Sequence, residues 1–574
     1  MKRNSLKRKF LLIKIRLLTE AAADLYITKL YKSLLLLQFF IFVGLAAQAE
    51  DSILDSALNT TLSPTAALNT NLNEVDQIIH RMTLEEKIGQ LFVLGFKEQE
   101  FTPSLEQFLR TYKPGGLIFF SRNGRSPEKV LKLIQDIKDF YKKINKIEPF
   151  FVVDHEGGEV VRVGPPHFFP SALSLGQTKD QSIAYELGKW TGRYLKNLGF
   201  DINLAPVVDL RSETALNFIG DRSYSSSPDD VVRMVGPYIS GARASGVLSV
   251  LKHFPGHGRL EEDTHFEVVR KISNVTELNQ KDLLPFRKLI KQHPSTAVMT
   301  SHLSVPALDP SGELTTFSKP IVSKLSNEYQ HEGLVLSDDF DMLFFKNKNL
   351  NVGEKVLAAL NAGHDQLLIV WSKLNQMKAQ KFLKQKMEDN AIDPDLIESK
   401  LRKVIATKLR LKDDRRLNYE KVKKSLAKIY SLQEQISFIH FNKLPKNLIQ
   451  EISTEIDSKK TVYLFSYSYL FFKNFKDNFS KGGFIPLGQE QWSQALNRCK
   501  KHICFFHVSG DQSALRAKEI PKDLQKYMIV INTSDPTVTK DIESKKLNLY
   551  SKSNKFWKWF ADEIEKIKDN YAVN

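Results

Sequence analysis

The stretch PFFVVDHEGGEVVR, residues 149–162, joins a short apolar run to a polar turn that contains two glycines. The run Phe150–Val153 has the length and the residue types of a buried strand, and Asp154 follows it directly. The glycines permit a tight turn, and Arg162 comes a few residues later. Asp154 could therefore bind hydroxyl groups of a ligand, or it could belong to an ordinary strand-to-helix turn.

The same arrangement recurs along the chain, because short apolar runs alternate with stretches of helical character. The other runs are Leu91–Gly95, Gly116–Phe120, Ile202–Val207, Leu248–Lys252, Ala297–Thr300, Leu334–Leu336 and Gln366–Val370. Buried strands that are separated by helices pair in parallel, and eight such units predict an α/β fold, a (β/α)8 TIM barrel. Catalytic side chains of this fold lie at the carboxyl ends of the strands, where Asp154, Lys252 and Asp338 fall.

Changes in composition predict the domain boundaries. The barrel is expected over residues 73–410, with a capping box at Thr83 and Glu86 near its start. A charged helical connector is expected over 411–429, followed by a smaller α/β sandwich domain over 430–574. Strands of that domain are predicted at Val462–Phe465, Phe484–Leu487, Ile503–Val508 and Met528–Ile531, and a helix at Gln489–Lys500.

The segment 1–49 is expected to be a signal peptide or an N-terminal anchor. Its apolar run, residues 34–47, follows two lysines and ends at Ala47-Gln48-Ala49, which is the order of a secretory signal. Residues 50–72, rich in Ser, Thr, Asn and Ala, predict a flexible linker. We expect a periplasmic or secreted protein, without stable membrane association once the signal is cleaved.

The balance of charges argues against a nucleic-acid partner. The formal net charge is +17, and nine Lys or Arg against two acids place +7 of it in residues 1–49. The remaining +10 is spread thinly, without a basic cluster interleaved with aromatic residues, so it is interpreted as a solvated surface.

The stretch KHFPGHGRLEEDTH, residues 252–265, is unusually rich in titratable groups. His253 and His257 have the spacing of zinc ligands on a helix, but the proline and glycine between them disfavour a helix. A metal site on a loop that includes Asp263 and His265 stays open as an alternative.

Asp263 and His265 also suit proton transfer. Two residues apart in an extended segment, their side chains point to the same side, so the carboxylate can fix the imidazole tautomer. The other ring nitrogen is then free to act as an acid or a base. Considered alone, the pair could equally be an exposed part of a polar loop.

The stretch GLVLSDDFDM, residues 333–342, ends a predicted strand in two aspartates. A carboxylate at such a strand end can attack the anomeric carbon of a sugar, which is the role considered for Asp338. The other interpretation is a helix cap, which Asp339 suits.

Together these stretches resemble glycoside hydrolase family three, and in particular its bacterial β-N-acetylglucosaminidase branch, the NagZ type. The similar motifs follow the family's order over residues 73–410: MTLEEKIGQL (82–91), DINLAPVVDL (201–210), IGDRSY (219–224), KHFPGHG (252–258) with Asp263 and His265, MTSHLSVPALD (299–309) and LSDD (336–339). Departures also occur, because His155, Glu159 and Val163 stand where the family more often has Gln, Arg and an aromatic residue.

The resemblance implies roles at the matching positions. Asp338 would be the nucleophile that forms a covalent glycosyl-enzyme, and His265, oriented by Asp263, would be the general acid and then the general base. The residues implied to bind the terminal N-acetylglucosamine are Asp154, Arg162, Arg222, Lys252 and His253. No metal or other cofactor is implied.

The implied activity is that of a retaining exo-β-N-acetylglucosaminidase, a β-N-acetylhexosaminidase, with N-acetylglucosamine-containing glycans or muropeptides from peptidoglycan as substrates. Two other activities of the family stay open, namely a β-N-acetylglucosaminide phosphorylase and a β-glucosidase. A non-catalytic cell-wall-binding protein is the alternative from a different class. The export signal and the added C-terminal domain are similar to those of larger secreted or periplasmic members.

Overall fold

The structure of the protein is a computed structural model. It describes residues 73–165, 168–212, 219–257, 274–343, 351–412 and 416–442, and the five strands 462–465, 482–485, 503–508, 528–532 and 545–548. The expected signal segment 1–49, the linker 50–72 and the helix predicted at Gln489–Lys500 lie outside the described residues. Among the described helices, none has the length and apolar character that a membrane span requires.

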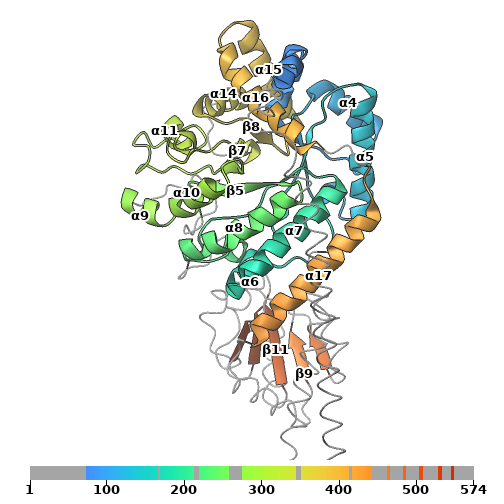
Figure 1. Ribbon diagram of the computed structural model, residues 1–574, viewed down its shortest axis with the longest axis vertical. Helices are drawn as coiled ribbons and strands as arrows, with labels where there is room; N and C mark the ends of the chain where they lie inside the picture. The colour runs from blue at the N-terminus through green and yellow to red at the C-terminus, as the bar shows by residue number, and fades with distance from the viewer. Residues whose placement is uncertain are drawn as a thin grey trace, which may run out of the picture. The chain divides into compact units, whose positions relative to one another are not determined.

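Eight strands close into a parallel barrel, in which each strand pairs with the next one along the chain and β8 pairs with β1 (Figure 1). Their bounds are β1 Phe92–Gly95, β2 Gly116–Phe119, β3 Phe150–Val153, β4 Ile202–Asn203, β5 Leu248–Phe254, β6 Ala297–Thr300, β7 Val335–Asp339 and β8 Gln366–Ile369. The predicted (β/α)8 barrel is therefore confirmed.

Helices separate the strands along the chain. They are α3 Leu84–Gln90, α4 Pro103–Tyr112, α5 Pro127–Lys143, α6 Ala172–Thr178, α7 Gln181–Leu198, α8 Pro228–Ala244, α9 Val275–Gln280, α10 Leu283–Gln292, α11 Lys319–Val322, α12 Lys324–Asn327, α13 Phe340–Leu343, α14 Val352–Ala362, α15 Lys373–Glu388 and α16 Pro394–Leu411, with short 3-10 turns η1 Ser121–Asn123 and η3 Gly220–Arg222. The capping box predicted before α3 is confirmed. The Thr83 backbone N–H donates to Glu86 Oε2 at 3.0 Å, and the Glu86 N–H donates to Thr83 Oγ1 at 3.3 Å.

Two strands differ from their predicted extents in ways that matter for the site. Strand β4 ends at Asn203, shortly before Pro206, which has no N–H to donate to a neighbouring strand. Strand β5 continues to Phe254, so Lys252 lies within the strand and not at its last residue.

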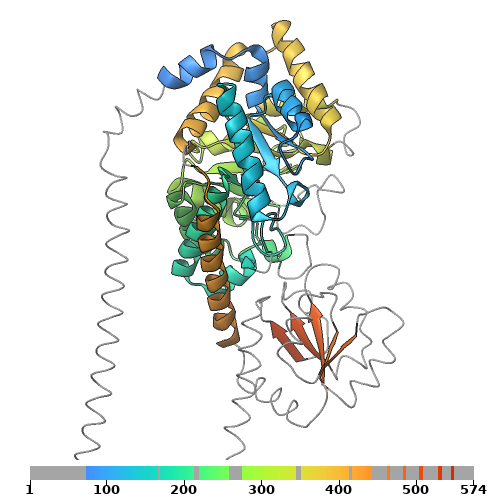
Figure 2. The ribbon, with the colours of Figure 1, turned by 90° about the vertical axis from the view of Figure 1, so that its right-hand side faces the viewer.

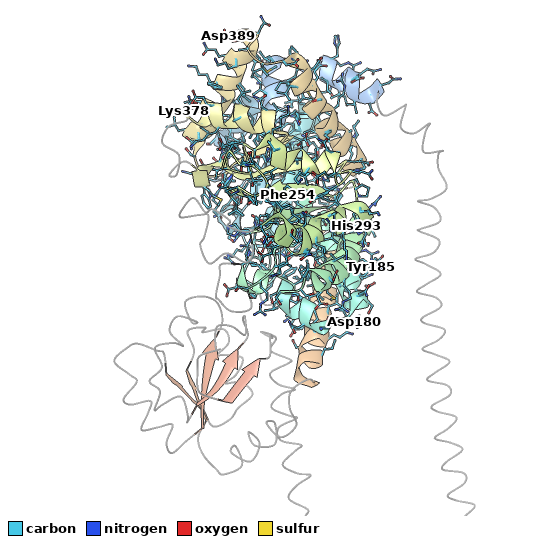
Figure 3. The ribbon with its side chains drawn as sticks, turned by 90° about the vertical axis from the view of Figure 1, so that its left-hand side faces the viewer. Asp180, Tyr185, Phe254, His293, Lys378 and Asp389 are labelled. Carbon is cyan, nitrogen blue, oxygen red and sulfur yellow. The ribbon has the colours of Figure 1, made fainter. Side chains whose placement is uncertain are left out.

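The barrel is filled and surrounded by apolar side chains. Its interior contains buried residues from all eight strands, among them Val93, Ile118 and Leu336. Phe254 of β5 (labelled in Figure 3) is buried between the barrel and helix α10, with its ring edge-on to Phe286 at a centroid distance of 5.3 Å. This packing fixes the positions of the strand ends that carry the polar side chains of the site.

The last described helix, α17 (Tyr419–Asn442), packs against α5, α6 and α7 on the outside of the barrel (Figure 1). Its buried residues Val422, Ile429 and Ile436 recur every seven positions, which places them on one face of the helix. The helix runs across residue 430, where the sequence predicts the change from connector to C-terminal domain.

The C-terminal part of the chain contains a second parallel sheet of five strands (Figure 2). The strand order is β10–β9–β11–β12–β13, with bounds β9 Val462–Phe465, β10 Gly482–Ile485, β11 Ile503–Val508, β12 Met528–Asn532 and β13 Lys545–Asn548. Four of these correspond to predicted strands. The sequence of β13, KKLN, has no apolar run and was not predicted.

Three of the buried histidines in the barrel domain, His155, His331 and His364, have strongly lowered pKa values. His331 Nε2 lies 2.6 Å from the Thr296 carbonyl oxygen, and His364 Nε2 lies 2.8 Å from Thr300 Oγ1. Neither ring nitrogen of His155 has a hydrogen-bond partner among the described residues. Burial lowers the pKa of His331 and of His364 to about 4, and burial together with the charge of Arg162 lowers the pKa of His155 to about 3.

These depressed pKa values predict a loss of stability in mild acid. As pH falls below the ordinary value of 6.5, the unfolded imidazole binds a proton that the folded one excludes, so the free energy of unfolding falls until the folded pKa is reached. His155→Gln should reduce this slope by about 1.4 kcal/mol per pH unit between about pH 6 and pH 4. Urea unfolding over this range measures it.

The control for this prediction is His80→Gln. His80 is exposed on the helix of residues 73–80, so water surrounds its ring before and after unfolding. An unchanged slope in His155→Gln would show that the buried imidazole does not carry this pH dependence.

Candidate active site

The carboxyl ends of β3 and β5 and the loop after β4 bring together three side chains that the sequence predicts for the site. Asp154 follows β3, Lys252 comes from β5, and Arg222 ends the 3-10 turn η3. Lys252 Nζ lies 2.6 Å from Asp154 Oδ1, although 98 positions separate the two residues. The closed barrel places their strands near each other, as predicted.

Glu156 is the centre of this group. Its Oε1 lies 2.7 Å from Lys252 Nζ, and its two oxygens accept hydrogen bonds from Arg222 Nε at 2.8 Å and Nη2 at 2.9 Å. The side chains of Glu156 and Lys252 are each only 3% exposed. We call Asp154, Glu156, Arg222 and Lys252 the charge cluster. It has two carboxylates and two cations, so its formal charges balance.

The charge cluster shifts the pKa values of its members in opposite directions. Burial alone would raise the pKa of Glu156, but the charges of Arg222 and Lys252 hold that pKa well below its usual range. Burial alone would lower the pKa of Lys252, but Asp154 and Glu156 raise it. Glu156 and Lys252 are therefore both ionised at neutral pH.

Sequence reasoning missed Glu156, although a signal was present. Glu156 lies two residues after Asp154, and in an extended segment such residues point to the same side. An acid at this position, with two basic residues predicted for the same site, was a candidate for their partner.

A second buried carboxylate holds the segment that carries His253. Asp209 Oδ2 accepts the His253 backbone N–H at 3.1 Å and lies 2.6 Å from His253 Nδ1, while its Oδ1 accepts the His257 N–H at 2.7 Å. Burial opposes ionisation of Asp209, but His253 and the His257 N–H lower its pKa. The contact with Asp209 assigns a ring proton of His253 to Nδ1, the nitrogen that faces the carboxylate.

The two aspartates that end β7 have different environments. Asp338 is partly exposed, and its Oδ1 accepts the Asp339 backbone N–H at 2.8 Å. Asp339 is buried, and its Oδ1 accepts the N–H groups of Val370 and Asp341, both at 3.1 Å. Burial and the neighbouring carboxylates raise the pKa of Asp339 well above its usual value. Asp339 thus starts the next helix, α13, and Asp338 is the more accessible carboxylate.

Arg162 is not hydrogen-bonded within the charge cluster. Its guanidinium carbon lies 5.4 Å from the centroid of the Phe120 ring, and its buried Nε has no partner among the described residues. His265 and Asp263 lie outside the described residues, so the acid–base pair stays a prediction. Within the part of the chain that the structure describes, no group of three His, Cys, Asp or Glu side chains could hold a metal ion.

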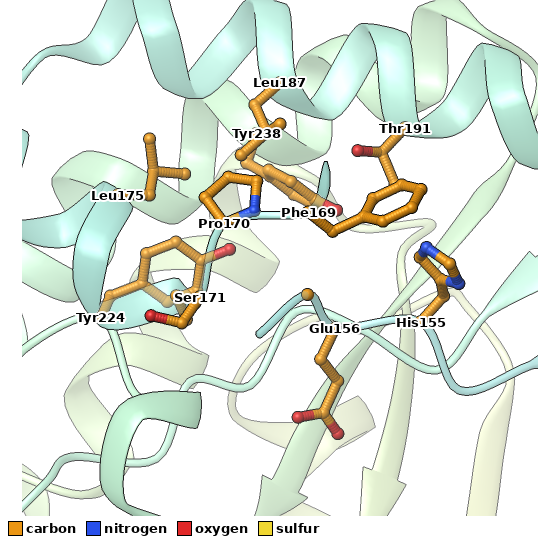
Figure 4. Close-up of a pocket in the computed structure, with 12 residues that line it drawn as sticks. His155, Glu156, Phe169, Pro170, Ser171, Leu175, Leu187, Thr191, Tyr224 and Tyr238 are labelled. Atoms are coloured by element: carbon orange, nitrogen blue, oxygen red, sulfur yellow. The ribbon is translucent and has the colours of Figure 1, made fainter. Parts of the chain in front are cut away.

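A small cavity lies behind the turn that carries Glu156 (Figure 4). Its lining includes Phe169, Tyr224 and Tyr238, and the Glu156 carboxylate points away from these rings. The cavity has a volume of about 10 Å³, which is room for one water molecule and not for a sugar. It therefore belongs to the support of the turn and not to a substrate site.

The arrangement can bind and position a polyhydroxylated ligand. Carboxylate oxygens accept hydrogen bonds from hydroxyl groups, and ammonium and guanidinium groups donate to hydroxyl and carbonyl oxygens. The Asp338 carboxylate, at the end of β7, is partly exposed, and a carboxylate can act as a nucleophile toward a sugar.

Comparison with known proteins identifies the family of the chain. Residues 83–407 match the model of the glycosyl hydrolase family 3 N-terminal domain. β-Hexosaminidase LpqI of Mycobacterium tuberculosis is 39% identical over 304 residues, which are 50% of this chain and 73% of that protein. β-Hexosaminidase A of Pseudoalteromonas piscicida is 28% identical over 332 residues, which are 54% of this chain and only 55% of that longer relative.

A solved structure shares the fold. The glycoside hydrolase family 3 β-N-acetylglucosaminidase from Paenibacillus sp. str. FPU-7 superimposes with a TM-score of 0.70 at 22% identity, covering 85% of this chain and 97% of that one. The family model matches more than half of the chain and contains every residue of the charge cluster. The chain therefore belongs to glycosyl hydrolase family 3.

Proposed function

We propose that this protein is a retaining exo-β-N-acetylglucosaminidase, a β-N-acetylhexosaminidase that removes terminal N-acetylglucosamine from a glycan. The observation that carries the proposal is the charge cluster beside the carboxyl ends of the barrel strands, together with a partly exposed Asp338. The relatives named β-hexosaminidases support the choice of sugar.

In the proposed reaction, a carboxylate oxygen of Asp338 attacks the anomeric carbon and the glycosidic C–O bond breaks. The departing oxygen takes a proton from the imidazolium of His265. Water then gives a proton to His265 and attacks the same carbon, which releases Asp338. Two inversions at the carbon give net retention of configuration. The charge cluster holds the sugar through its hydroxyl and acetamido groups during both steps.

We further propose that the glycan is a peptidoglycan fragment and that the protein acts in the periplasm or outside the cell. The sequence of residues 1–49, which has the order of a secretory signal, supports the location. The resemblance to the NagZ-type branch supports muropeptides as substrates.

Product analysis on a defined muropeptide tests the function. We expect free N-acetylglucosamine, released first as the β-anomer, at a rate that phosphate does not change. Formation of a sugar 1-phosphate would identify a phosphorylase instead. Faster cleavage of an aryl glucoside than of the aryl N-acetylglucosaminide would identify a β-glucosidase, and binding without cleavage would favour a wall-binding protein.

The leaving group separates the roles of His265 and Asp338. His265→Ala should lower kcat about 10²- to 10⁴-fold on an unactivated glycan, because the departing oxygen then receives no proton. The loss should be much smaller on an aryl glycoside whose phenolate leaves unaided. Asp338→Ala should abolish turnover of both substrates. If His265→Ala lost activity equally on both substrates, the acid role would be ruled out.

Removing the charge of Glu156 should impair the site without changing its shape. Glu156→Gln removes the negative charge to which Arg222 donates two hydrogen bonds, and it leaves Asp154 as the carboxylate paired with Lys252. We therefore expect kcat/KM to fall about 100-fold. Glu148→Gln is the control, because it removes an ion pair 3.2 Å long with Lys138 before β3, at the opposite end of that strand. Similar kcat/KM values for Glu156→Gln and the unsubstituted enzyme would contradict the central role of this carboxylate.

A further inference from the structure

The carboxyl ends of β2 and β8 carry an aromatic pair that the proposed chemistry does not use. Phe120 follows β2, and Trp371 lies two residues after β8. Their ring centroids are 5.3 Å apart, with the ring planes 44° from each other. Trp371 is 60% exposed, which is high for so large an apolar side chain.

The exposed indole is held in place by its surroundings. The Trp371 backbone N–H donates to Asp341 Oδ2 at 2.6 Å, and the Ser372 N–H donates to the same oxygen at 2.8 Å. Asn375 Nδ2 donates to the other oxygen of Asp341 at 2.7 Å. These bonds fix the backbone just before α15, from which the indole projects.

Arg122 fixes the orientation of the pair. Its guanidinium carbon lies 4.0 Å from the centroid of the Trp371 ring and 4.9 Å from that of Phe120. Its nitrogens donate to the carbonyl oxygens of Phe96 at 2.9 Å and Val370 at 2.8 Å. Because Arg122 covers one side of the indole, the exposed area belongs to the other side.

Contacts link the aromatic pair to two residues that are part of the proposed site or near it in the sequence. Phe120 contacts Arg162, which is predicted to bind the terminal sugar. Trp371 is tied to Asp341, three residues after the nucleophile Asp338. In the closed barrel, β2 is next to β3 and β8 is next to β7, so the pair spans the side of the barrel between the strands that carry Asp154 and Asp338.

We infer that Trp371, supported by Phe120 and Arg122, binds the sugar on the leaving-group side of the scissile bond. The inference rests on the proposed function. The charge cluster binds the terminal sugar, and the next sugar of the glycan needs a binding surface at the rim of the barrel. The face of a pyranose ring presents C–H groups, which pack on the electron-rich face of an indole. Trp371 would thus discriminate among substrates by the group to which the terminal sugar is linked.

Two unactivated substrates that differ only in the leaving group test this inference. N,N′-diacetylchitobiose places a second sugar on the leaving side, whereas methyl β-N-acetylglucosaminide has only a methyl group there. Trp371→Ala should lower kcat/KM for the disaccharide about tenfold and leave that for the methyl glycoside within about twofold. Trp371→Phe should retain most of the activity on the disaccharide, because an aromatic face remains.

Leu374→Ala is the matched control, since Leu374 is 53% exposed on the first turn of α15 and should affect neither substrate. An equal loss on both substrates, or no loss on either, would overturn the inference while leaving the proposed function intact. If the unsubstituted enzyme cleaved neither substrate, the proposed function would fail and this inference with it. An unchanged midpoint of thermal unfolding in Trp371→Ala shows that a loss confined to the disaccharide does not come from misfolding.

Discussion

The fixed position of Lys252 inside the barrel depends on two carboxylates. A buried ammonium group has a large desolvation cost, which opposite charges and hydrogen bonds must offset. Asp154 and Glu156 do this from the turn after β3, and Arg222 completes the balance from the loop after β4. Three segments of the chain are thereby held at one end of the barrel by a single set of ion pairs. The terminal sugar would meet groups whose directions are already set, so little reorganisation accompanies binding.

The closed barrel explains how distant segments of the chain form one site. Parallel strands all end on the same side, and the residues at their carboxyl ends are brought together whatever their separation in sequence. Arg122 and Val370 are 248 positions apart, yet they are joined by a hydrogen bond of 2.8 Å. Asp209 makes a similar connection between the loop after β4 and the end of β5.

Much of this arrangement could be predicted from the sequence. Short apolar runs indicate buried strands, and the order of the sequence motifs indicates the family. The strands β3, β6, β9 and β11 lie at the predicted residues, and Asp154, Arg222 and Lys252 do meet. Glu156 and Asp209 were missed, since an acid in a motif does not reveal which buried cation or backbone N–H it faces. The pairing of Phe120 with Trp371 depends on closure of the barrel, which no local pattern contains. Strand β13 escaped prediction because tertiary pairing, not apolar character, makes KKLN extended.

The different environments of Asp338 and Asp339 have a consequence for the intermediate. A sugar that loses its leaving group develops positive charge at the anomeric carbon and the ring oxygen. Burial favours the neutral form of Asp339, so this carboxyl group adds little repulsion to Asp338, the proposed nucleophile next to it. In the proposed reaction, the attacking carboxylate therefore has no second anion at position 339 beside it. In the proposed glycosyl-enzyme at Asp338, the neutral Asp339 places no anion beside the anomeric carbon to repel the partly deprotonated water that attacks it.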